Sequence, residues 1–186
     1  DMLIVKRRTG GTGSWAVWHK DLTTAYWLRL DTDVAQASGV WDGLNPNSEK
    51  FFITGGSSNV NISGSDYVFY AWKSVQGYSK FGKYVGNAVV NGPFVYTGFK
   101  PAFIMTKTVN AVEGWGIYDN KRSGFNVYND VLSPNSQGAT YGGSNYNFMD
   151  ILSNGFKMRR ATYGPNQSAN YIYMAFAENP FVTSTG

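Results

Sequence analysis

Apolar and polar residues alternate with a period of two along much of the chain, which is the period of a β-strand. The alternating segments are rich in valine, isoleucine and aromatic residues, and glycine- and asparagine-rich turns separate them. Strands are predicted at residues 2–7, 14–19, 25–31, 50–54, 66–73, 93–98, 102–107, 114–119, 125–129, 155–160 and 170–177. Helix is predicted only as one short turn near residues 33–38. The pattern indicates an all-β protein, a β-sandwich of the jelly-roll or concanavalin-like kind.

The segment from Tyr67 to Trp72 is apolar or aromatic on both of its faces. Such a strand is typical of the centre of a sheet that is covered on both sides. Residues 171–176 have the same character, so a central strand is predicted in each half of the chain.

Much of the first half is similar to the second half at an offset of about 100 residues. Residues 3–6 match residues 104–107, and residues 13–18 match residues 113–118, in the same order along the chain. The matching positions are mostly aromatic, aliphatic or glycine, which specify strands and turns, and Lys6 with Lys107 is the one charged match in these segments. An internal duplication of a fold is therefore predicted, without a duplicated catalytic set.

The duplication predicts two β-sandwich copies, one in residues 1–76 and one in residues 77–186. The sequence leaves open whether each copy is its own sandwich or both share a larger one.

Composition adds a description of the surface. Glycine makes up 22 of the 186 residues, against a usual ~7%. Charged residues are only 15% of the chain, against a usual ~25%, while aromatic residues reach 17%. The surface is expected to consist of Ser, Thr, Asn, Gly and Tyr, which suits polar recognition or contact with other subunits.

Charge and cysteine content argue against several classes of function. The net charge of +4 is small, and the basic residues are scattered along the chain. No zinc-finger, helix-turn-helix or RNA-binding motif accompanies them, so no nucleic-acid partner is expected. The absence of cysteine excludes disulfides, thiolate metal sites and a cysteine nucleophile. No apolar run approaches the ~20 residues of a membrane span, so no membrane insertion is expected. The first residues lack the profile of a signal peptide.

No set of catalytic, metal-ligating or cofactor-binding residues is recognisable. The single histidine, His19, alternates with Trp15 and Val17 on a predicted strand, which favours a structural position. Asp31 and Asp33 resemble the start of a calcium loop whose later ligands are missing. Glycoside hydrolysis needs two carboxylates at a fixed separation, and no pair among the 12 acidic residues stands out.

Aromatic residues in loops rich in Gly, Asn and Ser suggest carbohydrate binding, because a flat ring can stack on a sugar while neighbouring polar groups bind its hydroxyls. The candidates are Trp27, Trp41, Tyr141, Tyr146 and Tyr163. The alternative is that these rings pack at strand ends or at a subunit interface.

Five segments of the second half carry a recognisable pattern, namely residues 77–87, 92–102, 115–122, 150–159 and 171–181. They resemble a module found near the C-terminal ends of tail-fibre and other virion proteins of tailed bacteriophages. Residues 76–181 match it closely and residues 1–75 match it more loosely. Because Asp1 aligns with Ala102, the chain is expected to begin inside a longer fibre protein.

The resemblance implies a virion protein of the tail fibre, made in the host cytoplasm and acting outside the cell. It implies contact with a host cell-surface glycan or receptor and with other virion subunits, and it supplies no catalytic residues. Fibre ends of this kind are usually trimers, so a homotrimer is predicted. The low charge and high aromatic content are compatible with such assembly.

Three functions remain open from the sequence. The first is a non-enzymatic attachment module that binds a host cell-surface glycan or protein. The second is a polysaccharide depolymerase, a glycoside hydrolase that cuts that glycan. The third is a structural spacer or decoration domain of the virion that binds nothing.

Overall fold

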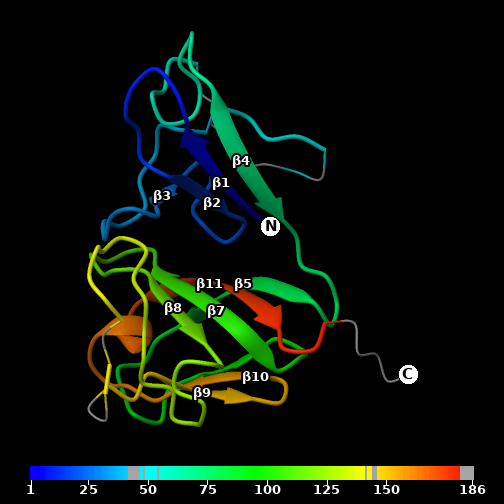
Figure 1. Cartoon of the computed structure of the whole chain (residues 1–186), viewed down its shortest axis with the longest axis vertical. Helices are drawn as coiled ribbons and strands as arrows, with labels where there is room; N and C mark the ends of the chain where they lie inside the picture. The colour runs from blue at the N-terminus through cyan, green and yellow to red at the C-terminus, as the bar shows by residue number, and fades with distance from the viewer. Residues whose placement is uncertain (42–46, 48, 54, 141, 144–145, 181–186) are drawn as a thin grey trace.

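The protein was analysed as a computed structural model, which describes residues 1–41, 47, 49–53, 55–140, 142–143 and 146–180 (Figure 1). Within these residues the chain forms 11 strands and one 3-10 helix, η1 at Gly164–Asn166. The strands make three antiparallel sheets. The predicted all-β, sandwich-like fold is confirmed.

The first sheet comes entirely from the first half of the chain. Its strands lie in the order β3 (Leu28–Arg29), β2 (Ala16–His19), β1 (Met2–Arg7) and β4 (Tyr67–Trp72).

The other two sheets come from the second half. The second sheet has the order β5 (Ser79–Val85), β11 (Asn170–Ala177), β7 (Pro101–Thr108) and β8 (Gly116–Asp119). The third has the order β6 (Phe94–Tyr96), β10 (Gly155–Met158) and β9 (Met149–Leu152).

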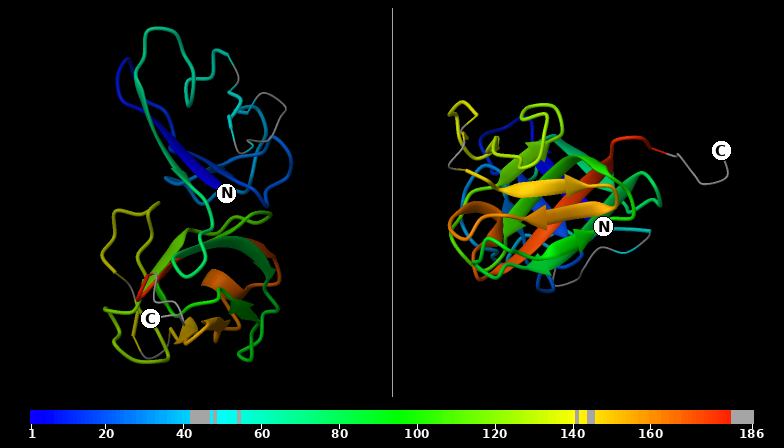
Figure 2. Two further views of the ribbon diagram at one scale, coloured as in Figure 1. Left: turned by 90° about the vertical axis from the view of Figure 1, so that its right-hand side faces the viewer. Right: turned by 90° about the horizontal axis from the view of Figure 1, so that it is seen from below.

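The three sheets are stacked, with the first above the second and the third below it (Figures 1 and 2). Strand β1 shows why the first sheet needs cover on both faces, because its successive side chains point to opposite sides. Ile4 lies in the apolar cluster between the first and second sheets. Its neighbours Leu3 and Val5 lie in a separate cluster on the outer face of the first sheet.

The apolar layer between the first and second sheets draws on both halves of the chain. It joins Met2, Ile4, Val17, Leu22 and Leu28 to Phe81, Met105, Val109, Trp115, Ile172 and Met174. The indole N–H of Trp115 also donates a hydrogen bond to the Arg29 carbonyl oxygen at 2.7 Å. Buried Lys107 donates to the Asp33 carbonyl oxygen at 3.2 Å. Burial lowers the pKa of Lys107 to about 8.

The strand arrangement of the two halves corresponds. Strands β2, β1 and β4 lie in the same order as β8, β7 and β11. The registers also correspond, since Leu3 lies opposite Ala71 and Ile104 lies opposite Ala175. A duplication predicts this correspondence, and the duplication and its two-domain division stay predictions.

Strand β4 is not the central strand that its sequence predicts. It lies at the edge of the first sheet and pairs with β1, and its residues Phe69 and Tyr70 are 57% and 46% exposed. Strand β11 has the predicted central position, between β5 and β7. The difference lies in the neighbouring strands. Strand β11 has β5 on one side and β7 on the other, whereas in the part of the chain that the structure describes β4 has only β1 beside it.

Other predictions of local structure also differ from the fold. Residues 125–129 and the described residues of 50–54 form no strand, although Tyr128 makes a single bridge to Met149. The short helix expected at residues 33–38 is irregular backbone, with Ala37 bridged to Trp27. Strand β5 was not predicted, because Lys80, Gly82 and Lys83 interrupt its apolar alternation.

Candidate functional site

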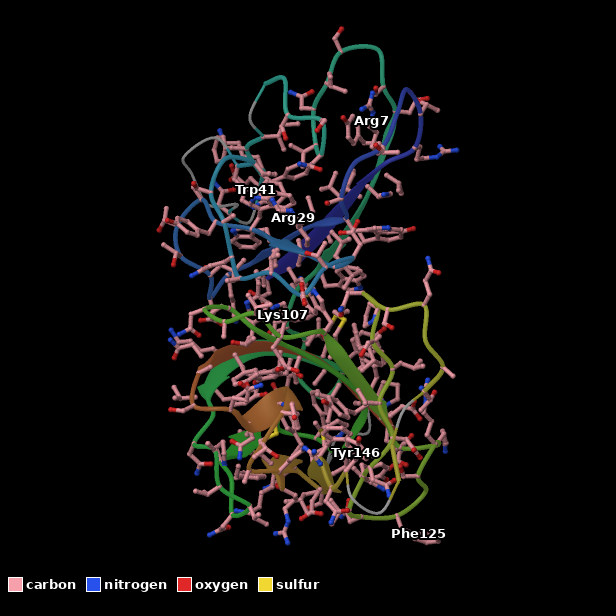
Figure 3. All side chains as sticks on the ribbon, turned by 90° about the vertical axis from the view of Figure 1, so that its left-hand side faces the viewer. Arg7, Arg29, Trp41, Lys107, Phe125 and Tyr146 are labelled. Carbon is pink, nitrogen blue, oxygen red and sulfur yellow. The ribbon has the colours of Figure 1, made fainter. Side chains whose placement is uncertain are left out.

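Two of the candidate sugar-binding residues, Trp27 and Trp41, lie inside the first half. Their exposed fractions are 3% and 2%, and both belong to the cluster on the outer face of the first sheet. The Arg29 guanidinium also covers the Trp27 ring, at 4.2 Å from its centroid. A buried ring has no open face for a sugar, so we assign both residues to the core. Figure 3 shows Trp41 in the upper part of the molecule, above Lys107.

Tyr146 and Tyr163, in contrast, come together at the surface of the second half, and Figure 3 shows Tyr146 in its lower part. Tyr163 is 67% exposed and Tyr146 is 36% exposed. The guanidinium of Arg160 lies 4.7 Å from the Tyr146 ring centroid and 5.6 Å from that of Tyr163. Cation–π attraction of this kind holds the two rings beside one cation. The fifth candidate, Tyr141, lies outside the described residues.

Two hollows flank Tyr163. One, of about 280 Å³, is lined by Glu113, Tyr146, Phe148 and Tyr163. The other, of about 470 Å³, is lined by Ala88, Glu113, Ala161, Thr162, Tyr163, Gln167 and Ser168. Tyr163 and Glu113 line both, so they are the centre of a shallow site with an aromatic wall and a polar wall.

The polar wall is an acid–amide pair. The side-chain amide of Gln167 donates a hydrogen bond to the carboxylate of Glu113. The backbone N–H of Glu113 in turn donates to the Asp33 carbonyl oxygen at 3.0 Å, which attaches this loop to the first half of the chain. Carboxylate and amide groups are suitable partners for the hydroxyls of a sugar, since together they donate and accept hydrogen bonds.

The loop that carries Tyr163 is firmly held. Asn166 is fully buried, and its side-chain amide donates to the carbonyl oxygens of Val89 and Arg160, both at 2.8 Å. The hydroxyl of Tyr84 donates to the Pro165 carbonyl oxygen at 2.7 Å. Burial raises the pKa of Tyr84 well above its usual value, so the hydroxyl keeps the proton that it donates. The loop is thereby held on one side by the backbone of Val89 and Arg160 and on the other side by Tyr84 of β5.

Tyr163 itself has a backbone conformation that is unusual for a residue with a side chain. Its φ is 58° and its ψ is 160°, a region occupied almost only by glycine. Such strain costs roughly 1–3 kcal/mol and persists where the surroundings impose it, commonly at functional sites. The strained backbone places the ring outward into solvent.

His19 has a structural position, as its alternation predicts. It is 1% exposed, and its Nε2 lies 3.3 Å from the carbonyl oxygen of Tyr173, across the layer between the first and second sheets. Burial lowers its pKa to about 4, against a weaker opposing effect of Asp21. A neutral histidine at neutral pH therefore helps to join the two sheets.

The described residues contain neither a metal-binding cluster nor a membrane-spanning helix. No group of three or more His, Cys, Asp or Glu residues there is arranged to hold a metal ion. No helix in the same part of the chain has the length and apolar character needed to cross a membrane.

The sequence pattern did not identify Arg160, Glu113 or Gln167 as site residues. Arg160 belongs to the basic pair Arg159-Arg160, which is the one signal that could have attracted attention to it. Glu113 and Gln167 lie more than 50 residues apart in the chain and meet only in the fold.

A family model described as a domain of unknown function (DUF7483) matches residues 1–180. No curated protein and no solved structure matches the chain.

Proposed function

The chain belongs to the family described as a domain of unknown function (DUF7483), and we propose that it is a non-enzymatic receptor-binding module that attaches to a host cell-surface glycan. The observation that carries this proposal is the outward ring of Tyr163 beside the pair of Glu113 and Gln167. An exposed aromatic ring next to a few polar groups is the usual chemistry of a small-ligand site.

The proposed binding mode assigns a part to each wall. The face of a sugar ring stacks on Tyr163, and Tyr146 closes the far side of the smaller hollow. Sugar hydroxyls bind the Glu113 carboxylate and the Gln167 amide, while Arg160 holds the two tyrosines in place.

The resemblance to tail-fibre modules supplies the biological setting of the proposal. The chain acts as part of a bacteriophage virion, outside the host cell that made it, and it contacts other virion subunits. A homotrimer is proposed on the same ground. Light scattering tests the trimer, since it predicts three times the mass of the single chain and a monomer contradicts self-sufficient assembly.

The depolymerase alternative requires two carboxylates about 5 to 9.5 Å apart on either side of the scissile bond. Among the described residues that line the two hollows, Glu113 is the one carboxylate. Incubation with host envelope polysaccharide distinguishes the two functions, because reducing ends released over time indicate cleavage and contradict attachment alone.

The binding proposal is tested on intact host cells and on a glycan array. Replacing Tyr163 by Ala is expected to weaken binding at least tenfold, which corresponds to about 1.4 kcal/mol, while Tyr163→Phe keeps the stacking face and most of the affinity. Phe125 is 84% exposed and lies outside both hollows, so Phe125→Ala is a matched control that leaves binding unchanged. Equal binding by the Tyr163→Ala variant and the parent chain would refute the site.

A further inference from the structure

Among the described residues, the outer edge of β4 is unpaired and its surface is apolar. Along its inner edge β4 pairs with β1 from Tyr67 to Trp72, and among the described residues no strand pairs with its outer edge. Phe69 and Tyr70 are about half exposed there. The free backbone N–H and C=O groups of such an edge are a template for another strand.

Strand β5, at the edge of the second sheet, shows how this chain protects an edge. Its exposed residues include Lys80 and Lys83, and charged side chains on an edge strand oppose pairing with another chain. From Tyr67 to Trp72, β4 has no charged residue, no proline and no glycine. The outer edge of β4 therefore lacks the protection that β5 has.

The second half of the chain shows what kind of strand fits there. Beside β11, which corresponds to β4, strand β5 places Gly82 opposite Tyr173. A Cβ atom at Gly82 would lie 2.9 Å from the Tyr173 ring, so only glycine leaves room for the ring. Phe69 has the position of Tyr173 in β4, so a strand with the pattern of β5 places glycine opposite it. A second copy of β4 has no glycine to supply.

Charge supports the same pattern. Asp66, which directly precedes β4, accepts a hydrogen bond from Thr9 and forms no ion pair with another described residue. In the β5–β11 pair, Lys83 lies opposite Ile172, two residues from Asn170. The same register beside β4 brings a lysine to the diagonal neighbour of Asp66, where opposite charges attract.

We propose that the outer edge of β4 binds an antiparallel strand of a separate polypeptide that has the residue pattern of β5. The partner strand places glycine opposite Phe69, an aromatic residue opposite Tyr70 and a lysine near Asp66. Main-chain hydrogen bonds supply the affinity, and the alternating side chains supply the specificity, as in other cases of strand addition to a sheet edge. The inference is independent of the glycan site.

The test uses the whole chain and a labelled synthetic peptide with the sequence of residues 77–87, GYSKFGKYVGN. Fluorescence anisotropy is expected to show saturable binding. Hydrogen–deuterium exchange is expected to slow at least tenfold in residues 67–72, because backbone pairing protects amide groups whereas side-chain contact alone does not. A peptide with Gly82→Val is expected to bind at least tenfold more weakly.

A pair of variants in the protein tests the register. Ala71 is exposed, and its counterpart Ala175 lies opposite Lys80, so Ala71→Lys sets two like charges opposite each other whereas Ala71→Glu sets opposite charges there. The Lys variant is expected to bind the peptide at least tenfold more weakly than the Glu variant. Tyr163→Ala leaves peptide binding unchanged, which separates this surface from the glycan site.

Three results would overturn the proposal. One is no peptide binding, and another is binding that protects residues other than 67–72. The third is concentration-dependent protection of residues 67–72 in the chain alone, which would make a second copy the occupant.

Discussion

The two halves of the molecule cover the outer faces of their central strands in different ways, and the difference decides which aromatic residues remain at the surface. In the first half the cover is irregular chain, which buries Trp27 and Trp41 against β1 and β2. In the second half it is the third sheet (Figure 2), and Phe156 and Met158 of that sheet belong to the core. Since that sheet supplies the buried apolar surface, Tyr163 stays outside. Whether an aromatic loop residue is buried or exposed therefore depends on the layer that lies beside it.

The largest expected effect comes from separating the halves. Residues 77–186 alone expose one side of the layer that holds Phe81, Met105 and Met174, and an apolar face of that size favours association. The isolated segment is expected to aggregate, as light scattering and size exclusion would show. A monomeric, soluble and folded fragment would instead support two independent domains.

A single residue tests the same layer from the inside. Trp115 is 2% exposed and hydrogen-bonded to the first half, so Trp115→Ala is expected to lower the free energy of unfolding by about 3–5 kcal/mol. Trp15 is its counterpart in the other half but is only partly buried, and Trp15→Ala is expected to cost less. Urea denaturation of the two variants measures the difference, and equal losses would contradict the asymmetry of the layer.

His19 makes the junction of the sheets sensitive to acid. Its pKa is lowered from 6.5 to about 4 in the folded protein, so between these values the unfolded chain binds more protons and stability falls as the pH falls. The lowered pKa corresponds to about 3 kcal/mol, fully present above pH 6.5 and lost toward pH 4. In His19→Gln the slope of unfolding free energy against pH between 6.5 and 5 is expected to flatten. An unchanged slope would place the acid sensitivity in other groups.

Most of the fold follows from local pattern, whereas its edges do not. Strands such as β1, β7 and β11 were predicted because their apolar alternation is uninterrupted. Strand β4 has the same kind of sequence as β11, but among the described residues it has one neighbouring strand where β11 has two, which a segment's own residues do not reveal. Strand β5 was missed because an edge strand is half polar and carries Gly82, which lowers strand propensity.

The site was predicted in part, and for a related reason. Candidate aromatic loop residues could be named from composition, and Tyr146 and Tyr163 do come together. Trp41 could not be told apart from Tyr163, since both lie in polar, glycine-containing loops and only the covering layer separates them. Arg160 was missed because its role depends on the three rings around it, which approach each other only after folding.

The smallest expected effect is at Tyr163, and it contrasts this exposed aromatic residue with the buried Trp41. Tyr163 has a backbone conformation that favours glycine, so Tyr163→Gly is expected to raise the free energy of unfolding by roughly 1 kcal/mol as the strain is relieved, while glycan binding is lost. Trp41 is the buried aromatic loop residue of the comparison. Trp41→Ala is expected to lower the free energy of unfolding by about 3–5 kcal/mol and to leave glycan binding by the folded fraction unchanged. Urea denaturation and cell binding on the same samples measure both quantities. If Tyr163→Gly destabilised the chain, its ring would contribute packing rather than a binding surface, and the distinction between the two halves would fail at this position.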